Sequence, residues 1–442
     1  MNVIAEPGAS QHRLRENYLV AVLFFVNLVA YLDRQILSLL VDPIKQSLGL
    51  SDTMIGTLQG LAFVLTYSIG GLFLGRLVDR GHRRNLLLAC IIVWSVSAAS
   101  GAFVQSGWQL VLARAGVGLG EAALIPTAVS LLADTFKPER RGAALGIFSM
   151  GVHAGAGLAL VLVGILLPFA MVITEVIGRA GLTVEPWRVV LFALLLPGIL
   201  CIVLLVTVSE PARTMPVPPR GRIIDLRSWR QGAAVYVPHH LALALVTLNG
   251  FALGAWAPSI LIRQYGLSAS QAGLLYGSVA ATIGVVGAYA GGRIGDWRSR
   301  VGGVRARLLL AMWAMPISVA GFLLMGIAMT VSSVMIGIAI GFFGVVVAIV
   351  IGLVSISDLA PPQSRGQVTA IYLFFTGVLG SALGPVIAGA ANDRLKGLGI
   401  SLAQIVATIG MVGSMLAFVL LGLACARLRS AQTPTSSLDH QR

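Results

Sequence analysis

The chain has 442 residues, of which 57% are hydrophobic and only 11% are charged. Soluble domains are about half apolar and about a quarter charged, so this composition excludes an ordinary soluble protein and indicates a polytopic membrane protein. The net charge of +14 would favour a nucleic-acid partner in a soluble protein, but the bases gather on one predicted side of a membrane, which argues against that role.

Apolar segments of about 20 residues or more, each long enough to cross a hydrocarbon core about 30 Å thick, recur along the whole chain. Twelve such spans are predicted, six in each half. They cover residues 17–40, 54–75, 85–104, 108–133, 142–170, 187–208, 237–262, 270–295, 306–328, 331–357, 366–390 and 400–426.

These spans predict an all-α membrane protein made of two pseudo-symmetric six-helix bundles. A polar segment at 1–16 precedes the first bundle, which covers 17–208. The stretch at 209–236 is rich in proline and arginine and has no apolar run of spanning length, so it is predicted to be a cytoplasmic linker. The second bundle covers 237–426, and a polar cytoplasmic tail follows at 427–442.

The distribution of Lys and Arg predicts the orientation of the chain. With both termini in the cytoplasm, the inner loops and ends carry 23 of the 31 bases and the outer loops carry six. This asymmetry follows the positive-inside rule, and the inner bases can also meet anionic lipid head groups. We therefore expect an integral protein of the cell (inner) membrane with cytoplasmic N- and C-termini.

Two motifs occur once in each half of the chain. Gly75–Arg84, with the sequence GRLVDRGHRR, returns as GRIGDWRSR at Gly292–Arg300. Asp134–Gly142 and Asp358–Gly366 both place Arg-Gly seven residues after Asp. The chain therefore contains two copies of one unit, an arrangement with which secondary transporters enclose a central site.

The repeated motifs are predicted to form a gate. Asp79 and Asp296 are placed to meet the positive N-terminal ends of helices in the opposite half, a contact that exists only while the cytoplasmic side is closed. A tight loop with interfacial anchors is the alternative. Trp297 stands where the first copy has Arg80, so a weaker second gate is expected. The predicted gating residues are Gly75, Asp79, Arg80, Arg83, Arg84, Arg141, Asp296, Arg298 and Arg365.

Four charged residues lie deep within predicted spans: Asp33, Arg34, Arg114 and Glu121. Inserting such a charge costs about 2.5 to 3.5 kcal/mol even on the lenient scale, so the group is a functional candidate, with a structural ion-pair cluster as the alternative. Helical rise places Asp33 and Arg114 about 7 and 10 Å outside the bilayer centre, where they can pair. Arg114 and Glu121 share a helix face, so the group can line one cavity.

Further polar residues within the spans are weaker candidates for substrate contact. Asn27 and Tyr31 form a polar stripe with Arg34, although such stripes also hold helices together. His153 is a second titratable candidate, or a helix-to-helix hydrogen-bond donor. Asn249 belongs to a second half that has few polar groups and no deep charge. An ionic wall facing an apolar wall suits an amphiphile.

The motifs resemble those of a known family. Gly75–Arg84 is similar to the loop signature of the major facilitator superfamily, and Gly292–Arg300 resembles its weaker copy. The sequence GSALGP at Gly380–Pro385 resembles a glycine and proline pattern of an interface helix in the same superfamily. Tyr31–Arg34, together with the run from Arg114 to Glu121, resembles the spinster branch.

The resemblance implies export or redistribution of lysophospholipids or sphingoid phosphates. It implies proton-linked roles for Asp33 and Glu121, and contact of Arg34 and Arg114 with an anionic head group.

The sequence thus predicts a secondary active transporter that works by alternating access, with protons, membrane lipids and an amphiphilic small molecule as its partners. No phosphate-binding loop motif is present, which argues against a P-loop ATPase, and no convincing metal cluster or nucleophile elbow indicates another enzyme. No enzyme activity, cofactor or metal is therefore predicted. A monomer is expected. The alternatives are a proton-driven multidrug or organic-anion exporter, and a non-transporting lipid-binding or sensor protein.

Overall fold

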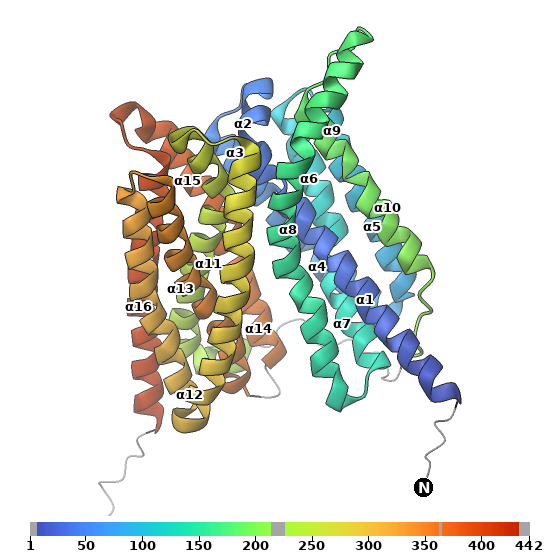
Figure 1. The fold of residues 1–442 in the computed structure, drawn as a ribbon. Helices are drawn as coiled ribbons and strands as arrows, with labels where there is room; N and C mark the ends of the chain where they lie inside the picture. The colour runs from blue at the N-terminus through green and yellow to red at the C-terminus, as the bar shows by residue number, and fades with distance from the viewer. Residues whose placement is uncertain (1–6, 214–225, 362–364, 433–442) are drawn as a thin grey trace, which may run out of the picture. The chain divides into compact units, whose positions relative to one another are not determined.

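The computed structural model describes residues 7–213, 226–361 and 365–432, and within these ranges the chain is helical with no strand (Figure 1). The prediction of an all-α protein is confirmed for this part of the chain. The α-helices are α1 (Pro7–Gln35), α2 (Leu37–Leu48), α3 (Asp52–Gln59), α4 (Leu61–Arg80), α5 (Arg83–Ser100), α6 (Gly107–Glu121), α7 (Leu124–Thr135), α8 (Pro138–Arg179), α9 (Pro186–Ala193), α10 (Leu195–Val206), α11 (Leu226–Tyr265), α12 (Ala269–Ile327), α13 (Val331–Leu359), α14 (Arg365–Phe374), α15 (Leu383–Leu395) and α16 (Leu402–Gln432).

Among the described residues, 11 helical stretches are long and apolar enough to cross a membrane. The longest, Ala269–Ile327, contains the predicted span 270–295 and all but the last residue of the predicted span 306–328. Its backbone leaves the helical conformation at Gly302 and Gly303, and the φ of Gly303 is 65°. Glycine tolerates this left-handed value without a steric penalty, so the change of direction falls between the two predicted spans.

The chain forms two compact units. Unit 1 comprises residues 1–221 together with 261–281, and unit 2 comprises 222–260 and 282–442. Unit 1 thus contains α1 to α10 with the end of α11 and the start of α12. Helix α11 begins at Leu226, inside the segment predicted as a linker.

Local sequence signals set several helix ends in unit 1. The Ser51 hydroxyl accepts a hydrogen bond from the backbone N–H of Met54 at 3.1 Å and caps the N-terminus of α3. Gly49, with a φ of 63°, ends α2 in the left-handed conformation typical of a helix C-terminus. These caps satisfy backbone groups that have no partner within the helix.

Helix α6 is held against two neighbours by alternating glycines. A Cβ atom at Gly118 would lie 2.4 Å from the carbonyl oxygen of Phe63 on α4, and one at Gly120 would lie 2.7 Å from the backbone nitrogen of Trp94 on α5. Because these glycines lie between Arg114 and Glu121, the close backbone contacts fix the positions of both charged residues.

Helix α1 packs most extensively on α8, and the two run side by side in Figure 1. A Cβ at Gly155 of α8 would lie 2.4 Å from the carbonyl oxygen of Leu28 on α1. Large apolar side chains on α8 to α10 point outward instead, among them Phe169, Val172 and Leu196, which are at least half exposed. Exposed apolar faces of this kind are the surfaces that acyl chains cover in a membrane.

Small residues bring helices together in unit 2 as well. A Cβ at Gly380 would lie 2.7 Å from Cβ of Thr247, and one at Gly384 would lie 2.6 Å from the carbonyl oxygen of Leu248. The expected close approach at Gly380–Pro385 is therefore present, against α11. This segment includes a π-helical stretch at Phe375–Ala382, a local distortion that is common at functional sites.

Gly120→Ala should destabilise the protein, because its methyl group would lie within 2.9 Å of backbone atoms of Trp94 and Cys90. Overpacking costs about 1 to 3 kcal/mol, which should lower the midpoint of thermal unfolding in detergent. Gly146→Ala in α8 is the matched control, since nothing lies within 4 Å of the added carbon. Equal midpoints for the two variants would contradict the contact of α6 with α5.

Candidate functional site

The four deep charges predicted from the sequence gather in unit 1: Asp33 and Arg34 near the C-terminal end of α1, Arg114 in the middle of α6 and Glu121 at its C-terminal end. The Arg34 Nε atom donates to Oε2 of Glu121 at 2.6 Å. The Glu121 side chain is fully buried, whereas 19% of the Arg34 side chain is exposed. Arg34 is therefore the member of this ion pair that a ligand can reach first.

Aromatic rings surround the Arg34 guanidinium group. Its central carbon lies 4.5 Å from the ring centroid of Tyr31, 4.6 Å from that of Phe63 and 4.9 Å from that of Tyr67. Ring faces attract a cation, and this attraction compensates part of the hydration energy that the buried cation has lost. The rings and Glu121 thus hold the guanidinium group in one orientation.

Arg114 makes a different contact from the one expected. Its NH1 group donates to the backbone carbonyl oxygen of Asp33 at 3.2 Å. Among the described residues no ion pair joins the two side chains, so the structure replaces the expected Asp33–Arg114 pair with the Arg34–Glu121 pair. The reason is that Asp33 and Arg34 are adjacent on α1 and point to different neighbours, which depth along a helix axis does not reveal.

Three buried polar atoms of this cluster have no hydrogen-bond partner among the described residues: Oδ1 of Asp33, Oε1 of Glu121 and Nε of Arg114. Leaving such an atom unsatisfied costs about 1 to 3 kcal/mol, or more when the group is charged. A proton on either carboxyl group would supply a donor, and an anionic ligand would accept from Arg114. The cluster can therefore bind both a proton and an anion.

Two of the other predicted substrate residues brace helices within their own units. Nδ2 of Asn27 donates to the carbonyl oxygen of Phe148 on α8 at 2.8 Å. Nδ2 of Asn249 donates to the carbonyl oxygen of Gly410 at 3.2 Å and to the Ser414 hydroxyl at 3.1 Å. For Asn27, this contact fits the alternative that the polar stripe holds helices together. His153 lies in α8, but its side chain is outside the described residues.

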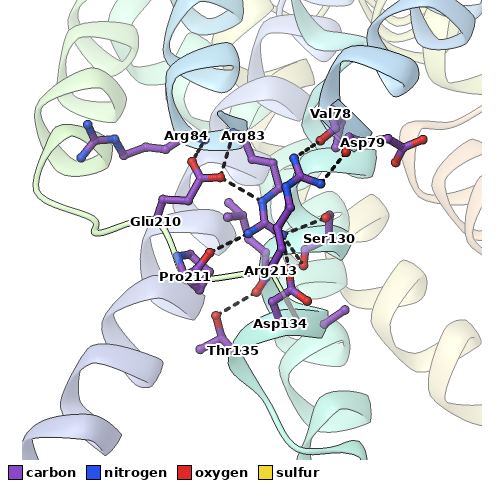
Figure 2. Close-up of polar contacts among 12 residues, drawn as sticks. Val78, Asp79, Arg83, Arg84, Ser130, Asp134, Thr135, Glu210, Pro211 and Arg213 are labelled. Carbon is purple, nitrogen blue, oxygen red and sulfur yellow. Dashed lines mark hydrogen bonds and ion pairs between the residues drawn. The ribbon is translucent and has the colours of Figure 1, made fainter. Parts of the chain in front are cut away.

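A second polar cluster, the Arg83 network, joins α5 to α7 and to the chain that follows α10 (Figure 2). Arg83 is completely buried. Its side chain donates to Oε1 of Glu210 at 3.1 Å, to the Ser130 hydroxyl at 3.0 Å and to the carbonyl oxygen of Pro211 at 2.7 Å, and it also pairs with Asp134. A guanidinium group with partners on several sides fixes the segments that carry them.

Glu210 closes the N-terminus of α5. Its carboxylate accepts the backbone N–H groups of Arg83 at 3.0 Å and of Arg84 at 2.9 Å, two donors that have no partner within the helix. Burial would raise the pKa of this carboxyl group, but the bonds from Arg84 and Arg83 outweigh burial and hold the pKa below its ordinary value.

Arginines also close the C-termini of three helices. Arg213 donates to the carbonyl oxygens of Val78 at 2.7 Å and Asp79 at 2.6 Å, at the end of α4, as Figure 2 shows. Arg141 donates to the carbonyl oxygen of Ala133 at 2.6 Å near the end of α7, and Arg84 donates to that of Val208 at 3.0 Å just after α10. Cations are favourable at these negative helix ends.

The predicted gating residues therefore divide into two groups. Arg83, Arg84 and Arg141 hold loops and helix ends within unit 1. Asp79 and Arg80 are exposed, and no partner of the Asp79 carboxylate is found among the described residues of unit 1. The side chain of Arg365 lies outside the described residues, and the gating role of Asp79, whose predicted partner is the helix end near Gly366 in unit 2, stays a prediction.

Unit 2 contains a counterpart of the Arg83 network, but its central arginine is not the one that the sequence motif aligns with Arg83. The motif matches Arg83 to Arg300, but it is Arg307 that pairs with Asp358. In both units the arginine precedes the aspartate by 51 residues. The chain of unit 2 has extra residues around the Gly302–Gly303 turn, which moves the equivalent arginine further along the sequence.

The second motif copy has its own local contacts. Asp296 pairs with Arg307 at 3.2 Å within unit 2, although 62% of its side chain is exposed. The Arg298 guanidinium group lies 5.7 Å from the ring centroid of Trp297. The Trp297 ring thus contacts Arg298, one of the bases of the second motif copy.

Sequence reasoning missed several residues that the structure brings into these clusters. Glu210 and Arg213 follow the sixth predicted span directly, and a Glu-Pro-Ala-Arg run at a span end was the available signal. Asp52 was also missed. It is completely buried and binds Lys45 at 2.7 Å and Arg263 at 3.0 Å, all within unit 1.

Glu210→Gln should lower the thermal stability at pH 7. It should also make the unfolding midpoint less dependent on pH in the acidic range. A carboxyl group whose pKa is lowered by folding stabilises the native state above its unfolded pKa of about 4.3, and this contribution is lost as pH falls through the lower folded pKa. Unfolding midpoints in detergent from neutral pH downward would measure this.

Glu175→Gln is the control for this measurement, because 67% of the Glu175 side chain is exposed. Curves of wild type and Glu210→Gln that stay parallel through the acidic range would contradict the role of Glu210.

The chain was compared with known proteins. It is 29% identical to an MFS-type efflux pump of Mycolicibacterium smegmatis over 93% of this chain and 92% of that protein. It is 27% identical to protein spinster homolog 1 of Homo sapiens over 86% of this chain and 74% of that protein. A match to the sphingosine-1-phosphate transporter SPNS2 of Danio rerio has 25% identity and covers 61% of this chain and 55% of that protein.

A solved structure has the same fold. A bacterial homologue of the human lysosomal transporter spinster, in an inward-facing and unoccupied conformation, superposes with a TM-score of 0.76 at 24% identity and covers 96% of both chains. Residues 23–385 match the sequence profile of the Major Facilitator Superfamily. Because this match covers most of the chain, the protein belongs to the Major Facilitator Superfamily of membrane transporters and is similar to its spinster members.

Proposed function

We propose that the protein is a secondary active transporter that moves a lysolipid-like or sphingoid-phosphate-like amphiphile by alternating access, coupled to protons. The observation that carries this proposal is the buried cluster of Asp33, Arg34, Arg114 and Glu121. It holds unsatisfied polar atoms of both kinds, acceptors on the carboxyl groups and a donor on Arg114.

The carboxyl groups are the proposed proton sites. Asp33 is 1% exposed and Glu121 is fully buried, so a proton stabilises each carboxyl group wherever no cation compensates its charge. Glu121 depends on Arg34 for its ion pair. A ligand that draws Arg34 away from Glu121 would therefore favour protonation of Glu121, which links substrate to proton.

The guanidinium groups are the proposed site for an anionic head group. A planar guanidinium group matches the oxygens of a phosphate, and Arg34 is the more accessible of the two. The name of the sphingosine-1-phosphate transporter of Danio rerio supports the same class of ligand. An attached hydrocarbon tail would contribute about 0.8 kcal/mol per buried methylene group.

The proposed arrangement in the membrane follows from the sequence. Twelve spans in two six-helix bundles, with both termini on the cytoplasmic side of the cell membrane, agree with the distribution of bases. The protein would act as a monomer, as two bundles in one chain already enclose a site.

A proton-driven exporter of drugs or organic anions is the second candidate. It is favoured by the similarity to an MFS-type efflux pump, which covers nearly the whole of both chains. Uptake by proteoliposomes of a panel of lysolipids, drugs and organic acids, with and without a pH gradient, would separate the two. Counterflow of a labelled ligand would exclude a protein that only binds lipid.

Asp33→Asn and Glu121→Gln should weaken concentrative transport while leaving exchange. Removing a coupling carboxylate should reduce gradient-driven accumulation by about 5- to 150-fold, the range of typical coupling free energies. Counterflow without a gradient should persist. Parallel assays in proteoliposomes measure both quantities.

Glu175→Gln, which removes an exposed carboxylate, is the control and should accumulate substrate like wild type. Wild-type accumulation by both Asp33→Asn and Glu121→Gln would remove these residues from the coupling mechanism.

Arg34→Lys should weaken binding of a phosphate-bearing amphiphile by about tenfold, because the variant loses the planar donor fork that the three rings and Glu121 orient. An amphiphile with the same tail and a hydroxyl head group should bind almost as before. Titrations of wild type, Arg34→Lys and Arg114→Lys with both ligands test this. If both ligands lose affinity equally, the arginines serve the ion-pair cluster and not the head group.

A further inference from the structure

Two adjacent histidines are buried in unit 2, remote in sequence from the cluster of unit 1. His239 and His240 follow Pro238 on α11, and neither side chain has any exposed surface. Their Nδ1 atoms lie 3.0 Å apart. In the sequence, the two residues stand out only as adjacent histidines inside a predicted apolar span.

Each imidazole also contacts a backbone carbonyl oxygen through its second nitrogen. Nε2 of His239 lies 3.2 Å from the carbonyl oxygen of Gly352 on α13, and Nε2 of His240 lies 3.3 Å from that of Val368 on α14. A carbonyl oxygen can only accept, so both Nε2 atoms must carry hydrogen.

Counting hydrogens on the four ring nitrogens gives the charge of the pair. Two neutral imidazoles carry two hydrogens, which the two Nε2 atoms use, and both Nδ1 atoms would then present lone pairs to each other. Two imidazolium groups carry four hydrogens, and two Nδ1–H groups would then collide. Three hydrogens satisfy all three contacts. The geometry therefore fits a pair that holds one excess proton.

The surroundings can support this charge. Tyr372 of α14 meets the His240 ring edge-on with centroids 5.6 Å apart, and Phe375 lies 6.2 Å away. The titratable groups beside the pair are Tyr372 and, on α11 itself, Tyr236, whose hydroxyl group donates to the carbonyl oxygen of Leu359. No charged side chain contacts the pair among the described residues of α11, α13 and α14. Aromatic rings and backbone carbonyl dipoles are thus the groups that face a cation at this site.

We propose that His239 and His240 form a proton-binding site in which the two imidazoles share one proton between their Nδ1 atoms. The proton comes from water, and binding forms one hydrogen bond without breaking another. When the proton leaves, the hydrogen bond between the two Nδ1 atoms is lost and their lone pairs repel each other, while both Nε2 contacts can remain. The π-helical stretch at Phe375–Ala382 follows α14 directly, so this change arises next to a local distortion of the helix. The proposal does not depend on the roles of Asp33 and Glu121.

Nitrogen NMR of the full chain in lipid nanodiscs, with ¹⁵N-labelled histidine, tests the site. The chain has six histidines, and His239 with His240 is the one pair of rings in hydrogen-bond contact among the described residues. We expect a correlation between two Nδ1 atoms through one shared hydrogen at acidic to neutral pH, and its loss as pH rises. His239→Gln and His240→Gln should each abolish the correlation, while the glutamine amide can still donate to the carbonyl oxygen.

His82→Gln, which removes an exposed histidine of a loop, should leave the correlation unchanged. The wild-type spectrum decides the matter even if a glutamine variant does not fold. Imidazole ordinarily titrates between about pH 5 and 8. The proposal would be overturned if the spectra showed two unprotonated Nδ1 atoms without a shared hydrogen at every pH in this range.

Discussion

The need to compensate charge in an apolar environment determines the arrangement of unit 1. The charges of Arg34 and Glu121 compensate each other in one ion pair at 2.6 Å, and aromatic rings surround the guanidinium group. The compensation is incomplete, because atoms of Asp33, Glu121 and Arg114 lack partners among the described residues. An incompletely compensated cluster is energetically sensitive to a proton or an anion, whereas a fully paired one would be inert.

The close packing of α6 makes this cluster possible. Gly118 and Gly120 bring the backbone of α6 against α4 and α5, and the adjacent Glu121 is fully buried. The same principle acts at the helix ends, where exposed backbone groups are satisfied by side chains. Glu210 closes the start of α5, and Arg213 closes the end of α4. Charged residues outside the spans thus hold the helices that position the charges inside them.

The two halves of the chain contain the same kind of arginine–aspartate pair, with different surrounding partners. Each pairs a buried or largely buried arginine, Arg83 or Arg307, with an aspartate 51 residues further along the chain. In unit 1 the network includes the segment after α10, and in unit 2 it includes Asp296 of α12. Duplication therefore preserved the central contact, while the partners around it diverged with the length of the loop.

The sequence by itself determined the all-α class, the family and the identity of the four deep charges, because hydropathy, repeated motifs and scarce intramembrane charges are properties of the chain alone. It did not determine which charge meets which. Asp33 and Arg34 differ by one residue and about 100° around a helix, so only packing decided that Glu121 binds Arg34. Only the tertiary structure matched Arg307 to Arg83 and brought His239 and His240 to the carbonyl oxygens of Gly352 and Val368, because those partners are distant in sequence.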